Sequence, residues 1–135
     1  MAGVVLPVLQ KRVFDFGHIP VGSAMVVTVA EHLDISQYTD CVLEVRTHES
    51  TLSGGQIAVD LFGDGFTKDD PSLTFLTQSA LISEITAPDA VGLKTSAGTA
   101  FGHFATLVIR GVRTSISPLN AALSVDLILR TPDDT

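Results

Sequence analysis

The chain has 135 residues, of which 45% are hydrophobic and only 17% are charged, and its mean hydropathy is +0.39. This length corresponds to one domain that can bury its own core, and the single cysteine, Cys41, excludes an internal disulfide. The formal net charge of −7 argues against nucleic acid as a direct partner, because such binding depends on Lys and Arg displacing counterions. The apolar surplus exceeds what a small soluble monomer usually carries, so we expect other subunits to cover part of it.

The first nine residues are apolar, but the segment is short. Pro7 interrupts it and no basic residue precedes it, so we expect neither a signal peptide nor a membrane span. The expected location is a virion or the cytoplasm. Two interpretations remain open for residues 1–9: an arm that lies against a neighbouring subunit, or the first strand of the protein's own sheet.

Alternation of apolar and polar residues, the pattern of a strand with one buried face, dominates the chain after this point. It is clearest in residues 41–48, 56–62 and 121–130. Residues 25–30 and 103–110 are apolar on both faces, which is typical of central strands or of strands covered by a neighbour. The expected strands, in chain order, are residues 8–16, 25–30, 41–48, 56–62, 73–77, 80–86, 103–110 and 121–130.

Turn-forming residues separate these segments. The expected chain reversals are at residues 17–22, 53–55, 63–65, 88–89, 96–98 and 117–118. Residues 34–38 are compatible with a short turn of helix, and nothing predicts a longer one. About eight strands spaced in this way predict an all-β fold, a single antiparallel β-sandwich spanning residues 1–135 and most simply an eight-stranded jelly roll.

The order of a strand, residues 33–40 and the alternating strand 41–48 resembles the opening of galactose-binding-like jelly-roll domains. The late pair, residues 101–110 and 121–130, is similar to the closing strands of such domains. The resemblance covers most of the chain in pattern and includes no diagnostic motif. Domains of this shape serve as carbohydrate-binding modules and as decoration or accessory proteins on virus particles, so the resemblance implies fold more than function.

Charge is distributed unevenly along the sequence. Residues 31–70 carry nine acidic residues against Arg46 and Lys68, whereas residues 101–132 carry three arginines against Asp126. One interpretation is that the acidic part of one copy meets the basic part of another. The other, which we favour, is that the charges interleave on neighbouring strands within one copy.

The acidic loop that contains Asp64, Asp69 and Asp70 is the best candidate for a metal site, because carboxylate oxygens are the ligands that calcium prefers. Its spacing does not match the twelve-residue calcium loop, and Lys68 lies inside the cluster. A solvated turn closed by Pro71 explains the same residues. The four histidines lack the convergent spacing of a zinc site, so we expect neither a metal nor another cofactor.

Catalytic and sugar-binding signals are weak. There is no G-x-S-x-G motif, and Cys41 falls on the apolar side of its strand, where a thiol packs as a small hydrophobe. We therefore expect no enzymatic activity. The chain has no Trp and a single Tyr, so the aromatic platform on which sugars usually stack is missing.

The leading hypothesis is a structural protein that associates through its surfaces, such as a virion decoration, cement or accessory capsid protein. Its expected partners are copies of itself and a capsid or other particle protein, with no membrane and no nucleic acid. The alternative is a non-catalytic carbohydrate- or ligand-binding module of galactose-binding type, with Asp64, Asp69, Asp70 and His103 near its site. The residues expected at the subunit interface are Val4, Val5, Leu6, Arg46, Arg110, Arg113 and Arg130.

Overall fold

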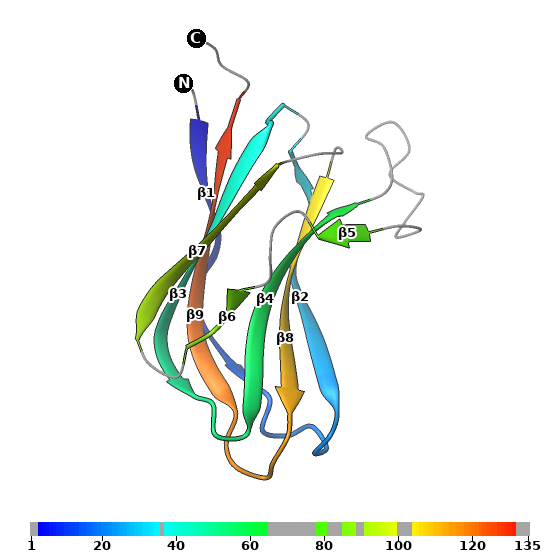
Figure 1. Ribbon diagram of the computed structural model, residues 1–135, viewed down its shortest axis with the longest axis vertical. Coiled ribbons are helices and arrows are strands. Elements are labelled where there is room, and N and C mark those ends of the chain that lie inside the picture. The colour runs from blue at the N-terminus through cyan, green and yellow to red at the C-terminus, as the bar shows by residue number, and fades with distance from the viewer. Residues whose placement is uncertain are drawn as a thin grey trace.

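Two antiparallel β-sheets face each other in the computed structural model, and both chain ends lie at the same end of the sandwich (Figure 1). The structure describes residues 3–35, 37–64, 78–80, 85–88, 91–99 and 104–131. The strands in these residues are β1 (Gly3–Asp15), β2 (Ala24–Asp34), β3 (Asp40–Thr51), β4 (Gly55–Asp64), β5 (Gln78–Ala80), β6 (Ile85–Thr86), β7 (Gly92–Thr99), β8 (Phe104–Arg113) and β9 (Asn120–Arg130).

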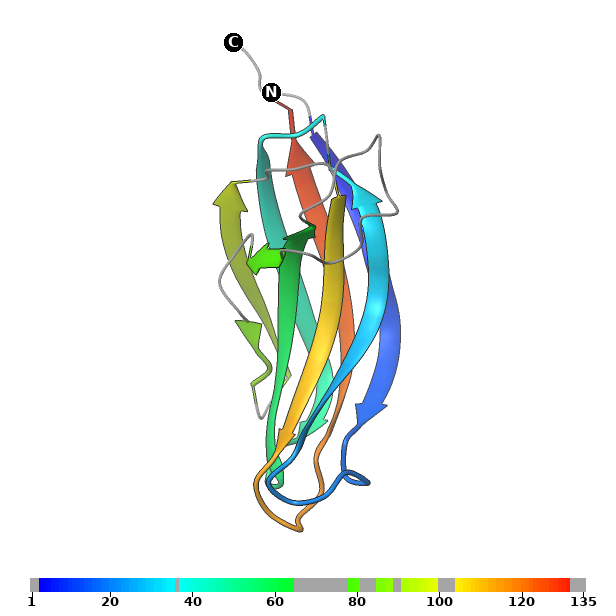
Figure 2. The ribbon, with the colours of Figure 1, turned by 90° about the vertical axis from the view of Figure 1, so that its right-hand side faces the viewer.

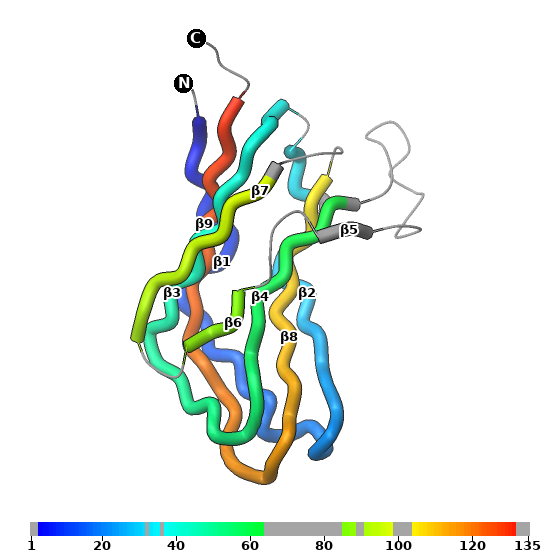
Figure 3. Tube along the Cα trace, in the orientation of Figure 1, coloured from blue at the N-terminus to red at the C-terminus, as the bar shows by residue number. Residues whose placement is uncertain are grey.

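The order of the strands is that of a jelly roll. One sheet has the order β1-β9-β3-β7, and the other has the order β2-β8-β4-β5, with β6 also paired to β4. The chain crosses from one sheet to the other at most connections, as the trace in Figure 3 shows. Because β1 pairs with β9, β2 with β8, β3 with β9 and β4 with β8, all antiparallel and far apart in sequence, the two sheets are wound together as in jelly rolls. The prediction of an all-β sandwich is confirmed.

The core lies between the sheets and is built from the alternating apolar residues of β3, β4, β8 and β9. The predicted inward residues of β3, β4 and β9 are all at most 2% exposed. They are Cys41, Leu43 and Val45 on β3, Ile57, Val59 and Leu61 on β4, and Ala121, Leu123, Val125, Leu127 and Leu129 on β9. Period-two alternation locates these faces because successive side chains of a strand point to opposite sides.

The inward face of β3 continues with a polar residue. Thr47 is 0% exposed, and its hydroxyl oxygen has no hydrogen-bond partner among the residues that the structure describes. It lies opposite Leu123 of β9 in the register of the sheet. A hydroxyl buried without a partner costs free energy, so this position is a local weakness of the core.

Phe16 closes the core where β1 ends. Its side chain is 1% exposed, and its backbone N–H donates to the Leu119 carbonyl at 2.8 Å. A Cβ atom at position 111 would overlap the Phe16 ring, so only glycine at this point of β8 lets the ring lie flat against the strand. Gly111 and Phe16 therefore form one packing unit.

The prediction of a turn at residues 96–98 is wrong, because these residues lie inside β7. Every residue of β7 pairs with β3, from Gly92 opposite Thr47 to Thr99 opposite Asp40. Gly, Ser, Ala and Thr dominate this strand, so it lacks the apolar alternation that marks a half-buried strand. Its conformation follows from hydrogen bonding to β3 rather than from its own side chains.

Other segments also differ from the sequence-based expectation. β4 continues through Asp64, where a turn at residues 63–65 was expected. The expected strand 80–86 is represented by the separate strands β5 and β6, and residues 73–77 lie outside the described part of the chain. In the segment 34–38, the described residues form no helix; the Tyr38 N–H donates to the Ile35 carbonyl at 3.1 Å instead.

Within the described ranges, no helix is long and apolar enough to cross a membrane.

Candidate functional site

The most unusual surface of the molecule is the side formed by the edge strands β1 and β2, which run along the same side of the sandwich (Figure 2). Five of the nine large hydrophobic side chains that are exposed in the described residues lie on these two strands. They are Val4 (42% exposed), Val5 (59%) and Val13 (64%) on β1, and Met25 (39%) and Val26 (54%) on β2. Natural proteins usually cover or pair apolar surface of this kind.

The core is also incompletely sealed on this side. Five of the hydrophobic residues that pack against the core while remaining partly exposed belong to β1 and β2: Leu6, Val8, Val27, Val29 and Leu33. In contrast, the inward residues Leu107 and Ile109 of the central strand β8 are fully buried. We refer to the exposed and partly exposed apolar residues of β1 and β2 together as the open side.

The structure places the predicted N-terminal interface residues in β1. Val4, Val5 and Leu6 pair with Leu129, Ile128 and Leu127 of β9. This arrangement corresponds to the strand interpretation of residues 3–9. The exposed side chains of Val4 and Val5 nevertheless remain available on the open side.

Residues 25–30 belong to β2, which is an edge strand and not a central one. The sequence does not distinguish these cases, because a central strand and a strand covered by another molecule are equally apolar on both faces. Met25 and Val26, which sequence analysis did not assign to an interface, therefore join the candidate surface. The signal for them was the apolar character of both faces in a strand that has no second neighbour within the described residues.

Arg110 and Arg113, two of the four predicted interface arginines, have hydrogen-bond partners within the chain. The Arg110 guanidinium donates from Nε to the Asp60 carboxylate at 3.3 Å, on neighbouring strands β8 and β4. Asp40 and Arg130 are directly opposite each other on β3 and β9. Acidic and basic segments thus interleave on adjacent strands, which favours the second interpretation of the charge distribution.

Arg113 holds loops together at the end of the sandwich opposite the chain ends. Its guanidinium donates to three carbonyl oxygens: Ile19 at 2.7 Å, Ile116 at 2.9 Å and Ser115 at 3.0 Å. The side chain thus connects the β1–β2 loop to the β8–β9 loop. Arg46 is exposed on β3, and Arg130 is exposed at the end of β9.

The β3–β4 turn strengthens the same end. The Gly54 N–H donates to the Pro118 carbonyl at 2.9 Å, and the Gly54 carbonyl accepts from the Thr114 N–H at 2.8 Å. A Cβ atom at position 54 would overlap the Ser117 carbonyl, so the close approach of the two loops requires glycine. At this end of the sandwich, in the β8–β9 loop, the side chain of Ile116 is 85% exposed.

The candidate metal residues are not assembled in the described part of the chain. Asp64 ends β4, whereas Asp69, Asp70 and His103 lie outside the described residues. Among the residues that are described, no group of three or more His, Cys, Asp or Glu side chains is placed to hold a metal ion. Asp60, which precedes the acidic loop, forms the ion pair with Arg110.

Cys41 is buried at 2% exposure on the inward face of β3. Burial, reinforced by the charge of Asp40, raises the pKa of its thiol, which donates weakly to the Gly98 carbonyl at 3.7 Å. A thiol in this environment stays protonated, and the thiolate is the form that acts as a nucleophile. On the outer face of the same sheet, His48 Nε2 and Ser124 Oγ are 2.9 Å apart.

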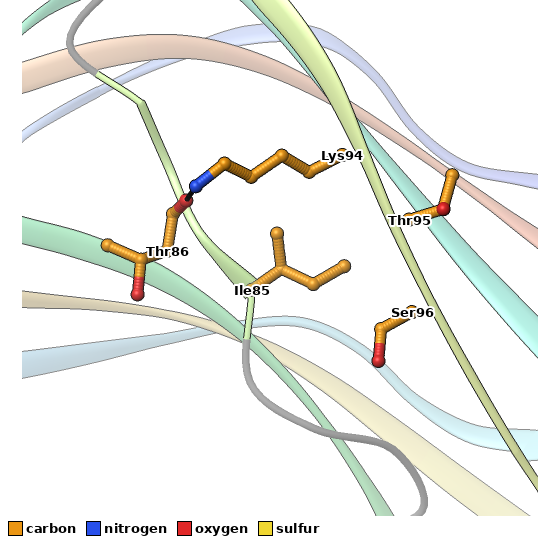
Figure 4. Close-up of a pocket in the computed structure, with 5 residues that line it drawn as sticks. All are labelled: Ile85, Thr86, Lys94, Thr95 and Ser96. Carbon is orange, nitrogen blue, oxygen red and sulfur yellow. Dashed lines mark hydrogen bonds between the residues drawn. The ribbon is translucent and has the colours of Figure 1, made fainter.

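A groove of about 360 Å³ lies between β6 and β7. The described residues that line it are Ile85, Thr86, Lys94, Thr95 and Ser96 (Figure 4). Lys94 Nζ donates to the Thr86 carbonyl at 2.9 Å across the groove. The volume is in the range of small-ligand sites, but none of these lining residues is aromatic.

No protein-family model matches the chain, and no curated protein matches it in sequence. Among solved structures, the chain is similar to the structure of infectious bursal disease virus Gx strain, with a TM-score of 0.64 and 9% identity over 99% of this chain and 34% of that one. It is also similar to the crystal structure of the infectious bursal disease virus VP2 subviral particle, with a TM-score of 0.62 and 11% identity over 96% of this chain and 32% of that one. The chain thus spans about a third of the length of the chains that it matches. At this level of identity the similarity establishes the fold, and the fold of this chain is one that also occurs in the structures of a virus and of its subviral particle.

Proposed function

We propose that this protein is a structural subunit of a virus or virus-like particle, either a shell protein or a decoration, cement or accessory protein bound to a shell. It acts through contacts between subunits and not through catalysis. Its partners are copies of itself and a capsid or other particle protein, and its location is the virion.

The open side is the observation that carries this proposal. It combines exposed valines on β1 with Met25 and Val26 on β2 and with core residues that one copy alone leaves partly uncovered. Burying apolar surface contributes about 25 cal/mol per Å², and the many equivalent contacts of a shell add avidity to each one. The shared fold with the particle structures described above agrees with this role.

The buried state of Cys41 supports a non-catalytic role. Its raised pKa keeps the one thiol of the chain in the unreactive form, so this residue is not a nucleophile.

Sedimentation velocity over a wide concentration range, followed by electron microscopy of the most concentrated sample, tests the proposal. Discrete oligomers or closed particles are the expected result, as is co-sedimentation with particles isolated from the source of the protein. A protein that stays monomeric at high concentration and binds no such particle would contradict the proposal.

The groove between β6 and β7 favours a second candidate function, a ligand-binding module related to the galactose-binding type. Its polar lining and its volume of about 360 Å³ suit a small polar ligand. Calorimetric titration with a panel of monosaccharides and disaccharides tests this function, with Lys94→Ala as the variant expected to weaken binding. If the wild type and Lys94→Ala give equal heats of binding in this titration, any sugar site lies outside the groove.

A further inference from the structure

β2 lies at the edge of its sheet but has the composition of a covered strand. Residues 24–30 contain no charged residue and no proline, and Val26 is 54% exposed. Edge strands are usually protected by charge, by proline or by being short. Of the other edge strands, β1 carries Pro7 and Lys11, β7 carries Lys94, and β5 has only three residues. β2 is the strand in the described structure that lacks these protections over most of its length.

The register of β2 on β8 shows which backbone groups face the free edge. The Arg113 N–H donates to the Ser23 carbonyl at 2.9 Å, and these two residues lie next to the first pair of the β2–β8 ladder, Ala24 and Val112. A bond between the neighbouring positions marks Ala24 and Val112 as a non-hydrogen-bonded pair, whose own N–H and C=O groups point away from each other. Hydrogen-bonded and non-hydrogen-bonded pairs alternate along an antiparallel ladder. From residue 24 to residue 28 the register is regular, without a bulge. The residues of this stretch whose N–H and C=O groups point away from β8 are therefore Ala24, Val26 and Thr28.

We propose that β2 pairs with β2 of a second copy of this chain, antiparallel and about a two-fold axis at Val26. In this register Val26 lies opposite Val26 of the second copy, and each Ala24 lies opposite a Thr28. Every outward-facing backbone group of the regular stretch is then used, in about six hydrogen bonds across the axis. The sheet β5-β4-β8-β2 continues into the same sheet of the second copy. The choice of a second copy as the partner rests on the proposed role in a particle.

Self-pairing fits this strand better than it fits β1. In a two-fold contact each strand meets its own sequence, so a charged edge places like charges near each other. The stretch from Ala24 to Thr28 carries no charge, whereas β1 has Lys11 and Arg12 in sequence. The second copy would also approach the partly exposed core residues of the open side, such as Val27.

A contact through one short strand is small compared with a standard interface of about 800 Å² per partner, so we expect it to be weak in isolation and effective when repeated. The net charge of −7 on each copy opposes association. Because salt screens this repulsion, higher ionic strength should strengthen the pairing.

Disulfide trapping of a Val26→Cys variant tests the axis directly. Residues of a hydrogen-bonded antiparallel pair have Cα atoms about 5.5 Å apart, which lies within the range of disulfides of roughly 4.4–6.8 Å. Leu93→Cys is the matched control, because Leu93 is similarly exposed (49%) but lies on β7 in the other sheet. The native Cys41 is 2% exposed and does not compete.

Under mild oxidation we expect Val26→Cys to form a covalent dimer at least several-fold faster than Leu93→Cys, as measured on non-reducing gels. Equal rates for the two variants would overturn the proposed pairing. As a second test, Val26→Lys places two ammonium groups at the axis and should abolish the dimer in sedimentation velocity, whereas Leu93→Lys should keep it. A dimer that persists in folded Val26→Lys would also overturn the pairing.

These tests separate the pairing from the proposed function. Particles that form although Val26→Cys shows no preferential crosslinking would overturn the β2 contact and leave the structural role intact. A trapped two-fold dimer in a protein that never forms or binds particles would support the contact and contradict the structural role.

Discussion

Replacing Thr47 by Val should stabilise the protein. Thr47 is fully buried on the inward face of β3, and no residue in the described structure pairs with its hydroxyl. Thr and Val have nearly the same shape and are both branched at Cβ, so the substitution keeps the packing and the strand preference. It removes only the hydroxyl that is buried without a partner.

Mutational data place the cost of such a hydroxyl at about 1–3 kcal/mol. We therefore expect Thr47→Val to raise the free energy of unfolding by about 1–2 kcal/mol, which corresponds to an increase in Tm of roughly 3–8 °C for a domain of this size. Urea denaturation monitored by circular dichroism measures the change. The midpoint should move to higher urea while the m-value stays constant.

Thr47→Ser is the matched control, because it keeps the hydroxyl and removes the methyl group. It should lower the free energy of unfolding by about 1 kcal/mol through the lost apolar contact. If Thr47→Val were instead less stable than the wild type, the hydroxyl would have to donate to a partner, and the reasoning would be refuted.

Three further substitutions and conditions test other parts of the structure. Gly111→Ala should lower the free energy of unfolding by about 1–3 kcal/mol, because the added Cβ overlaps the Phe16 ring. Adding Phe16→Leu to this variant should recover part of the loss. If urea denaturation shows that the effects of the two substitutions on the free energy of unfolding simply add, the two residues are not in direct contact. The raised pKa of Cys41 means that the folded state holds the thiol proton more tightly than the unfolded state does. The thiol's contribution to stability is therefore complete below the ordinary thiol pKa of 9.0 and is lost as the pH rises above it. Urea midpoints between pH 8 and pH 10 should therefore fall more steeply for the wild type than for Cys41→Val, and parallel curves would show that the thiol has no such effect. Arg113→Lys should lose part of the guanidinium hydrogen bonding that connects two loops, and thermal denaturation should show a loss of stability of about 1–3 kcal/mol. Arg46→Lys, at an exposed side chain of β3, should change the stability by less than about 0.5 kcal/mol. Equal effects of the two substitutions would mean that the Arg113 hydrogen bonds contribute nothing.

The sequence predicts the inner strands well because burial of one face leaves a period of two. The alternation at Leu43, Val59 and Leu127 marks three strands whose inward faces are buried in the structure. It does not predict β7, because that strand contributes few apolar side chains and depends on pairing with β3. Local sequence carries no information about a partner that lies elsewhere in the chain.

The candidate surface was only partly predictable for the same reason. The exposed apolar character of Val4 and Val5 follows from the N-terminal sequence. The edge position of Val26 does not, since it depends on which strands flank β2 after folding. The sequence predicts Arg113 as an interface residue, but its guanidinium donates to the carbonyl of Ile19, which only the tertiary structure brings near.

The pairing of the first strand with the last has a consequence for how the chain folds. β1 pairs with β9 from Gly3 opposite Arg130 to Asp15 opposite Asn120, and β2 pairs with β8. During synthesis, β1 and β2 therefore leave the ribosome long before their pairing partners β9 and β8 have been made. Bringing such distant strands together costs loop-closure entropy before the contacts that stabilise the pair can form. This cost slows folding and prolongs the exposure of apolar strands. We expect the domain to fold only after β9 has been synthesised, and to depend until then on whatever prevents nascent chains from associating through β1 and β2.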